Sequence, residues 1–91
     1  MRWIKDVKCL EEGYTLELCF DNDEWRRVDL QQHLVGEIFE PLRDLAYFRQ
    51  VVVNKDIDTV VWPNNADFSP DFLYDISESL SKTAKPANNK A

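Results

Sequence analysis

The sequence predicts an α+β fold: a small, mostly antiparallel sheet of about five strands in two hairpins, with a short helix and a C-terminal helix packed on one face. Three observations predict it. Apolar and polar residues alternate before residue 20, two pairs of strand-like segments are joined by polar turns, and a helix-capping signal stands at residue 69. A sheet covered in this way buries a single core.

The first three strands are predicted by alternation and a turn. Residues 14–20 place apolar side chains at every even position, which is the period of a half-buried strand. Residues 21–24 are Asp-Asn-Asp-Glu, typical of a turn. Residues 25–30 then return with Val28 and Leu30 facing the core, and residues 3–10 form a less regular strand paired with 14–20.

The middle of the chain is less periodic. Residues 31–43 are predicted to be a loop that Gly36 allows to bend and that is held by Ile38, Phe39 and Leu42. Asp44 is a suitable N-cap for a short helix over residues 45–48. A second hairpin follows, with strands at 50–53 and 59–62 around residues 55–58.

The corner that ends this hairpin is the most distinctive stretch, Trp-Pro-Asn-Asn-Ala-Asp at 62–67. Trp62 is predicted to end its strand facing the core, and Pro63 lacks the N–H that would continue the ladder. Asn64 and Asn65 suit the turn, and Asp67 is expected to accept hydrogen bonds from backbone N–H groups. An alternative reading makes Trp62, Pro63, Asn64, Asn65 and Asp67 a partner- or ligand-binding site.

A helix is predicted after this corner. Ser69 is a good N-cap, Pro70 suits the first helical position, and Asp71 meets the positive end of the helix dipole. Four apolar residues fall on one face at helical spacing and extend the predicted helix to residue 80: Phe72, Leu73, Ile76 and Leu80.

Length and composition predict one domain over residues 1–80. Ninety-one residues cannot fill two cores. Residues 81–91 contain no large apolar side chain and are expected to be a disordered tail. The first six residues already include Arg2, Lys5 and Asp6, which disfavours a signal peptide. No apolar run approaches the roughly 18–20 residues of a membrane span. We therefore expect a cytoplasmic location and no membrane partner.

The formal net charge of −6 disfavours direct binding of nucleic acid, since phosphate backbones are bound mainly by Lys and Arg. The same charge favours a basic partner protein. Nothing in the sequence predicts whether the chain forms homo-oligomers.

Catalytic and metal-binding patterns are weak. His33, the single histidine, lies in a polar stretch and is expected to face solvent, and Cys9 and Cys19 are expected to be reduced thiols on strands. Two glycines cannot form a Gly-rich phosphate loop, so no cofactor is predicted.

Acidic residues around the last helix are the better chemical candidates. Asp67, Asp71, Asp75 and Glu78 could supply oxygens to a hard cation, although their spacing matches no EF-hand, and we predict no metal site. Asp67, near Trp62 and Phe68, is the one carboxylate that an apolar pocket could hold as a catalytic acid.

Four segments resemble a family of short bacterial proteins called domain of unknown function twenty-four forty-two. They are "VDL" at 28–30, "IFEPLRDLAYF" at 38–48, "TVVWPNNAD" at 59–67 and "SPDFLYD" at 69–75, and the resemblance covers residues 3–77. It implies a compact α+β domain. Some relatives carry an additional helix-turn-helix domain, which we do not expect here, and their genes often adjoin those of other small uncharacterised proteins.

Two residues depart from the pattern of that family. Asp23 and Asn65 stand at turn positions where glycine is common in the family. Asp and Asn are among the few residues that adopt left-handed backbone conformations at modest cost, so the turns are expected to be kept.

The leading functional hypothesis is a non-enzymatic protein-interaction module, such as one half of a toxin–antitoxin-like or regulatory pair. The alternative is a small-ligand-binding or catalytic domain that uses the corner from Trp62 to Asp71. A third, a transcriptional regulator, would need a DNA-binding partner chain.

Overall fold

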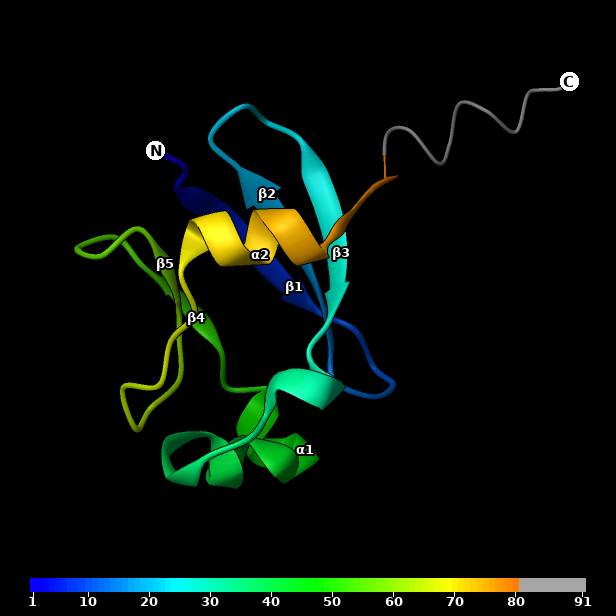
Figure 1. Cartoon of the computed structure of the whole chain (residues 1–91), viewed down its shortest axis with the longest axis vertical. Coiled ribbons are helices and arrows are strands. Elements are labelled where there is room, and N and C mark those ends of the chain that lie inside the picture. Colours follow the sequence, from blue (N-terminus) through cyan, green and yellow to red (C-terminus); the bar gives the residue numbers. More distant parts are fainter. Residues whose placement is uncertain (81–91) are drawn as a thin grey trace, which may run out of the picture.

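A computed structural model describes residues 1–80 and confirms the α+β class. Three strands come first, two 3₁₀ helices and a short α-helix follow, and a hairpin leads to the last helix (Figure 1). The elements are β1 (Ile4–Cys9), β2 (Thr15–Phe20), β3 (Trp25–Asp29), η1 (Gln31–His33), η2 (Glu37–Arg43), α1 (Leu45–Phe48), β4 (Val52–Asn54), β5 (Thr59–Val61), α2 (Pro70–Ile76) and β6 (Glu78–Ser79).

The main sheet has the order β1-β2-β3-β6, and all its neighbours are antiparallel. Its register pairs Leu16 with Val28 and Leu18 with Arg26, so these four residues share one face. A bulge between Ile4 and Asp6 interrupts the pairing of β1 with β2. The predicted alternation in β2 is confirmed, because Leu16, Leu18 and Phe20 are all buried.

Helix α2 crosses the core face of this sheet, while α1 and the 3₁₀ helices lie at one end of it (Figure 1). The β4–β5 hairpin forms a second sheet beside β1, and the amide of Ile4 donates to the carbonyl of Asp58 at 2.9 Å. The strands are therefore divided between two sheets, of four and two strands. The largest buried side chains come from every layer: Trp62, Phe20, Phe48, Ile4, Leu16, Leu18, Leu30, Leu34, Leu42, Leu73, Val28 and Val60.

The predicted loop at 31–43 is largely helical instead. It holds η1 and η2, whose 3₁₀ turns have no long apolar period for a sequence pattern to reveal. Leu42 is buried as predicted, whereas Ile38 is half exposed. The predicted cap of the next helix is confirmed, because the Asp44 carboxylate accepts from the amide of Ala46 at 3.0 Å.

The prediction that the last helix reaches Leu80 is wrong. Helix α2 ends at Ile76, and Ser77 takes an extended conformation with ψ of 167°. The Ser77 hydroxyl donates to the carbonyl of Tyr74 at 2.9 Å, and Arg26 donates to the carbonyl of Ser77 at 2.7 Å. A longer helix would use both carbonyls for its own N–H groups. The chain instead forms β6 on the edge of β3.

Two further expectations concern the ends of the chain. The proposed tail at 81–91 lies outside the described residues. Within residues 1–80, no helix is both long and apolar enough to cross a membrane.

Candidate functional site

Trp62 is a core residue, as the sequence predicts. Its side chain is 1% exposed, and its indole Nε1 donates to the carbonyl of Phe48 at 2.8 Å. Its ring lies 5.6 Å from that of Phe48 and 6.0 Å from that of Phe68. Trp62 follows the last residue of β5 and fixes the hairpin on α1.

The two asparagines build the turn. The amide of Asn65 donates to the carbonyl of Trp62 at 2.8 Å, and Asn65 has a φ of 70°. The Asn64 side chain accepts from the amide of Ala66 at 3.2 Å and donates to the carbonyl of Ile38 at 2.9 Å. Asn64 therefore ties the corner to η2. Asp23 also has a positive φ, 65°, so both departures from the family pattern lie in the left-handed region.

Ser69, not Asp67, caps α2. The Ser69 hydroxyl accepts from the amide of Phe72 at 3.4 Å. Asp67 is exposed and pairs with Val61 through its backbone alone. Within residues 1–80 its carboxylate makes no hydrogen bond or ion pair, which leaves it available at the surface together with the exposed ring of Pro63.

The acidic candidates do not converge on a metal site. Among residues 1–80, no group of three or more His, Cys, Asp or Glu side chains is arranged to hold an ion. Asp71 accepts instead from the amide of Arg2 at 3.3 Å. Asp75 and Glu78 are exposed.

A polar network that the sequence did not reveal ties α2 to the sheet. Arg26 points to the core face and donates to Glu24 at 2.9 Å and to the Ser77 hydroxyl at 2.7 Å. The Tyr74 hydroxyl donates to Glu24 at 2.7 Å, and the guanidinium groups of Arg2 and Arg26 lie 3.7 and 4.0 Å from the centroid of the Tyr74 ring. The only sequence signal is the even position of Arg26 in a strand whose even positions face inward.

The negative charge of the Glu24 carboxylate is strongly stabilised in this network. Hydrogen bonds from Ser79, Tyr74, Asn22 and Arg26 lower the pKa of Glu24 from 4.5 to about 2, against the opposing effect of partial burial. Glu24 is therefore ionised at every physiological pH. A permanently ionised carboxylate with several donors holds structure and is unsuited to general acid catalysis.

His33 lines a cleft of about 440 Å³ together with residues of β2, β3, α2 and β6. The prediction that His33 faces solvent is only partly correct, because its side chain is half buried. The His33 ring packs edge-on against the Phe72 ring, with 5.3 Å between the ring centroids. The cleft is lined by Thr15, Arg27, Asp29, Gln32, His33, Ile76 and Glu78. Its lining contains no cysteine, so His33 forms no Cys-His dyad there.

Both cysteines are free thiols, as the sequence predicts. Cys19 pairs with Asp6 across the β1–β2 ladder and is buried. Burial raises the pKa of both thiols above the ordinary value. Neither thiol therefore has the lowered pKa of a catalytic cysteine.

Four aromatic side chains contact one another in succession, and we call them the aromatic row: Phe39 on η2, Phe68 just before α2, Phe72 on α2 and His33 on η1. Phe39 stacks on Phe68 at 4.7 Å, Phe68 stacks on Phe72 at 6.0 Å, and Phe72 meets His33 at 5.3 Å. Phe72 is 37% exposed. Val35 lies between His33 and Phe39 in the chain and is 65% exposed, and Ile38 directly precedes Phe39 and is 50% exposed.

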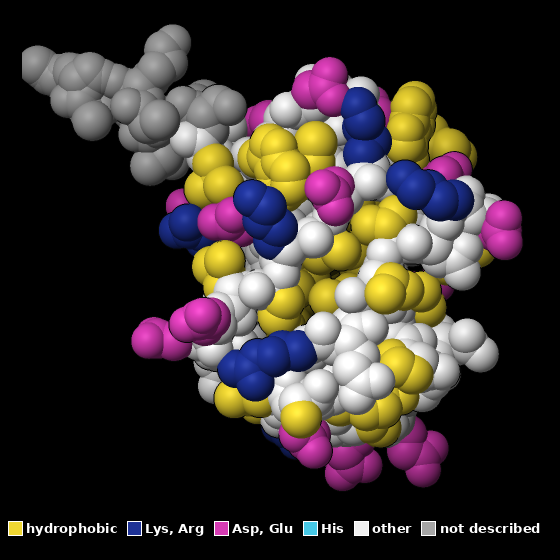
Figure 2. Space-filling view, turned by 180° about the vertical axis from the view of Figure 1, so that it is seen from behind, with side chains coloured by type: hydrophobic (Ala, Val, Ile, Leu, Met, Phe, Trp, Pro, Cys, Tyr) yellow, Lys and Arg dark blue, Asp and Glu magenta, His cyan; other side chains and the backbone are white. Residues whose placement is uncertain are grey.

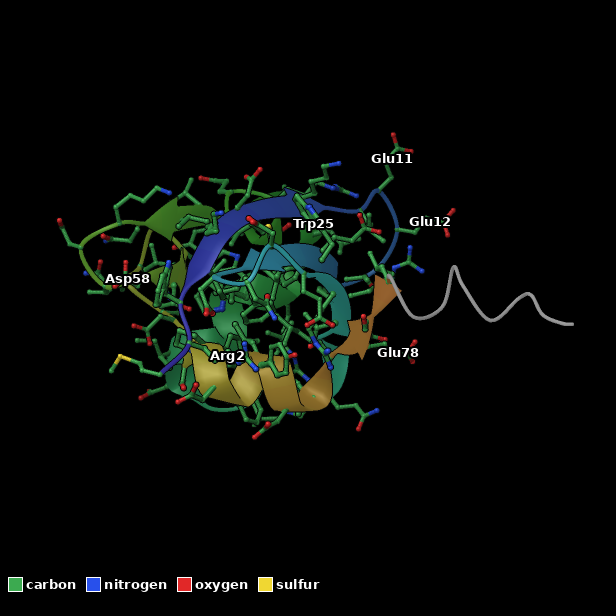
Figure 3. All side chains as sticks on the ribbon, turned by 90° about the horizontal axis from the view of Figure 1, so that it is seen from above. Arg2, Glu11, Glu12, Trp25, Asp58 and Glu78 are labelled. Carbon is green, nitrogen blue, oxygen red and sulfur yellow. The ribbon has the colours of Figure 1, made fainter. Side chains whose placement is uncertain are left out.

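The chain segments that carry the aromatic row lack basic residues. Residues 28–42 and 56–80 contain nine acidic residues and no Lys or Arg. The opposite face of the sheet differs, because Lys and Arg side chains lie among acids and apolar groups there (Figure 2). On that face Arg27 pairs with Glu17 at 2.9 Å, and Lys8 lies 5.1 Å from the ring of Trp25, which points away from α2 (Figure 3).

These features define a small α+β domain whose most distinctive polar residues build its turns, its helix cap and its helix–sheet contact. The chain belongs to the family described as "Protein of unknown function (DUF2442)", whose profile matches residues 4–79. Searches of curated proteins and of solved structures returned no match.

Proposed function

We propose that this domain is a non-enzymatic module that binds a basic partner protein. The observation that carries the proposal is the distribution of charge. All seventeen acidic residues, but only eight of the eleven basic ones, lie in residues 1–80. Two segments that meet at the aromatic row have no basic residue of their own, so a basic partner would complement their charge.

The polar clusters support a binding role over a catalytic one. The Glu24 network is occupied by contacts between α2 and the sheet, and Trp62 and Asn64 hold the corner together. A regulatory or toxin–antitoxin-like pair is the form of partnership that the family resemblance suggests. The proposed compartment is the cytoplasm, since both thiols are free in this fold.

A second candidate function is the binding of a small cationic ligand beside the corner. A hollow of about 280 Å³ adjoins it, lined by Met1, Arg2, Asp56, Ile57, Asp58, Ser69, Pro70 and Asp71. Three carboxylates in this lining would favour a cation, although Asp71 already accepts from the amide of Arg2. This candidate uses the Ser69–Asp71 side of the corner and leaves Trp62 in the core.

Affinity capture followed by reconstitution tests the proposal. The tagged protein is recovered from the organism that encodes it, and each co-purifying protein is produced separately and titrated calorimetrically. We expect a basic protein that binds saturably and more weakly as salt rises, because exposed charges are screened. Duplex DNA titrated at about 0.15 M salt should show no saturable site. Failure of every captured protein to rebind would contradict a protein-interaction role.

A further inference from the structure

We propose that the aromatic row, with Val35 and Ile38, is the docking surface for an amphipathic helix of the partner that carries Lys and Arg beside its apolar stripe. This inference rests on the proposed function, because it names the surface and the occupant of the same interaction. It concerns a surface that shares only Phe68 with the corner from Trp62 to Asp71.

The row offers exposed apolar area on either side of a buried ring. Phe68 is 8% exposed and stacks between Phe39 and Phe72 at 4.7 and 6.0 Å, so it supports its neighbours from the core. A bound helix would contact the outer parts of those neighbours, because Phe39 and His33 are half buried and Phe72 is 37% exposed. The exposed parts of Phe72, Val35 and Ile38 supply the apolar area that such a helix would cover.

The charges beside the row require a basic occupant. Glu37 and Glu40 flank Ile38 and Phe39 in the chain, and Asp75 lies one helical turn after Phe72. All three carboxylates are exposed, and within residues 1–80 none takes part in an ion pair. An acidic or neutral helix would leave these charges uncompensated at the rim of the contact.

The other exposed surfaces are less suited to this partner. On the outer face of the sheet, Lys5 pairs with Asp23 and Arg27 pairs with Glu17, so much of the charge is already compensated. The free edge of β1 is shortened by the Ile4 contact with Asp58, and Lys55 donates to the carbonyl of Lys5 at 3.3 Å. A bulge at the same place further blunts this edge against strand addition.

A designed peptide tests the surface directly. The probe is a fluorescein-labelled amphipathic peptide of Leu and Lys, about 14 residues or roughly four turns long, with a same-composition peptide of scrambled order as its control. Anisotropy gives its affinity for the full chain, and amide chemical shifts give its position. We expect saturable binding of the amphipathic peptide alone, with shifts confined to residues 33–40 and 67–76.

Acidic substitutions separate docking on the row from attraction by charge. Ile38→Glu and Phe72→Glu should weaken the amphipathic peptide at least ten-fold. The matched control Val52→Glu, at a 55% exposed valine on β4, should change its affinity less than two-fold. Each substitution adds a negative charge, so binding driven by charge alone would strengthen in all three. That result, or shifts spread over β1–β3, would overturn the proposal.

Two outcomes distinguish this inference from the proposed function. If a captured natural partner rebinds Ile38→Glu and Phe72→Glu as tightly as the parent, the row is not its site, although the protein-interaction role stands. If the parent associates with itself in sedimentation and Phe72→Glu does not, a second copy occupies the row and the partner-helix proposal is wrong. Val35→Glu, at a 65% exposed residue, replaces either variant that fails to fold by circular dichroism.

Discussion

The corner at residues 62–71 and the aromatic row meet at Phe68, yet they use their side chains in opposite ways. In the corner, Trp62 is buried with its indole N–H bonded, and Asn64 bonds the amide of Ala66 in the turn and the carbonyl of Ile38 in η2. Along the row, Phe72 is 37% exposed, and Val35 and Ile38, which precede Phe39 in the chain, are 65% and 50% exposed. The nearby Glu37, Glu40 and Asp75 make no ion pair within residues 1–80. The corner has the more unusual sequence, and the row has the larger exposed apolar area beside it.

This difference teaches that an unusual motif can reflect backbone demands alone. Trp-Pro-Asn-Asn is explained by a strand end, a residue without an N–H and a left-handed turn. The aromatic row is built from common residues that become neighbours only after folding. The variants below test the two regions by asking whether a change affects stability or binding.

Trp62→Ala should have the largest effect, a loss of about 3–5 kcal/mol in unfolding free energy, the range for deleting a buried aromatic side chain. It also leaves the carbonyl of Phe48 without its indole donor. Urea denaturation measures the loss, and Trp62→Phe should recover part of it by refilling the cavity. Nearly unchanged stability with abolished partner capture would instead make the corner a binding site.

Arg26→Met should cost about 2 kcal/mol, because it removes hydrogen bonds of a charged donor to Glu24 and Ser77. This variant tests whether the contact between α2 and the sheet stabilises the fold, as the corner does. Urea denaturation measures the cost, and Arg27→Met, at an exposed arginine on the outer face, is the control. Equal costs for the two would contradict a special role for the network.

Acid titration tests the same contact through Glu24. Its pKa in the folded protein is about 2, below the ordinary 4.5, so its stabilising contribution is present above pH 4.5 and is lost as the pH falls through about 2. The stability of the parent minus that of Glu24→Gln, followed by denaturation across this window, should shrink towards low pH. A difference that does not change with pH would show that the charge of Glu24 is unimportant.

Ser69→Ala should cost about 1 kcal/mol through the lost N-cap of α2. Ser69→Asp keeps a capping oxygen and should restore most of the loss. The same variants also test the row, because the amide that Ser69 caps is that of Phe72. Peptide affinity measured beside stability should therefore fall in Ser69→Ala and recover in Ser69→Asp.

Asn65→Gly should have the smallest effect, from zero to a few tenths of a kcal/mol of stabilisation, because glycine adopts a positive φ without steric cost. Asn65→Ala should be destabilising by contrast, since a β-carbon is strained at a φ of 70°. Thermal melts of the two Asn65 variants beside the parent protein measure both effects on stability. A loss of stability in the glycine variant would mean that the Asn65 side chain does more than permit the turn.

Local patterns predicted the local features of this fold. Alternation gave the core face of β2, and short polar side chains gave the caps at Asp44 and Ser69. Strand β6 could not be predicted in this way, because its two residues become a strand only through pairing with Arg26 and Arg27 of β3. The end of α2 depends on the same distant contact.

The candidate site was predicted less well for the same reason. The role of Trp62 in the core follows from its place between a β-branched run and a proline. The packing of Phe39 on Phe68 requires η2 and α2 to meet, and nothing in either segment alone specifies that meeting. Helical spacing placed Phe72 on the apolar face of the last helix with Leu73, but Phe72 is 37% exposed and only Leu73 is fully buried.

The two thiols give the sheet natural reporters of its own motions. Cys9 lies half buried on the edge strand β1, and Cys19 is buried on its neighbour β2. Thiol reagents attack the thiolate, and the raised pKa of each thiol keeps that form scarce at neutral pH. Cys9 packs against the core from the edge strand, whereas Cys19, at an odd position of β2, lies on the outer face beneath neighbouring side chains. Modification of Cys9 therefore reports opening of the edge, and modification of Cys19 reports movement of the outer-face side chains that cover it. The ratio of their labelling rates, read by mass spectrometry, compares the two motions.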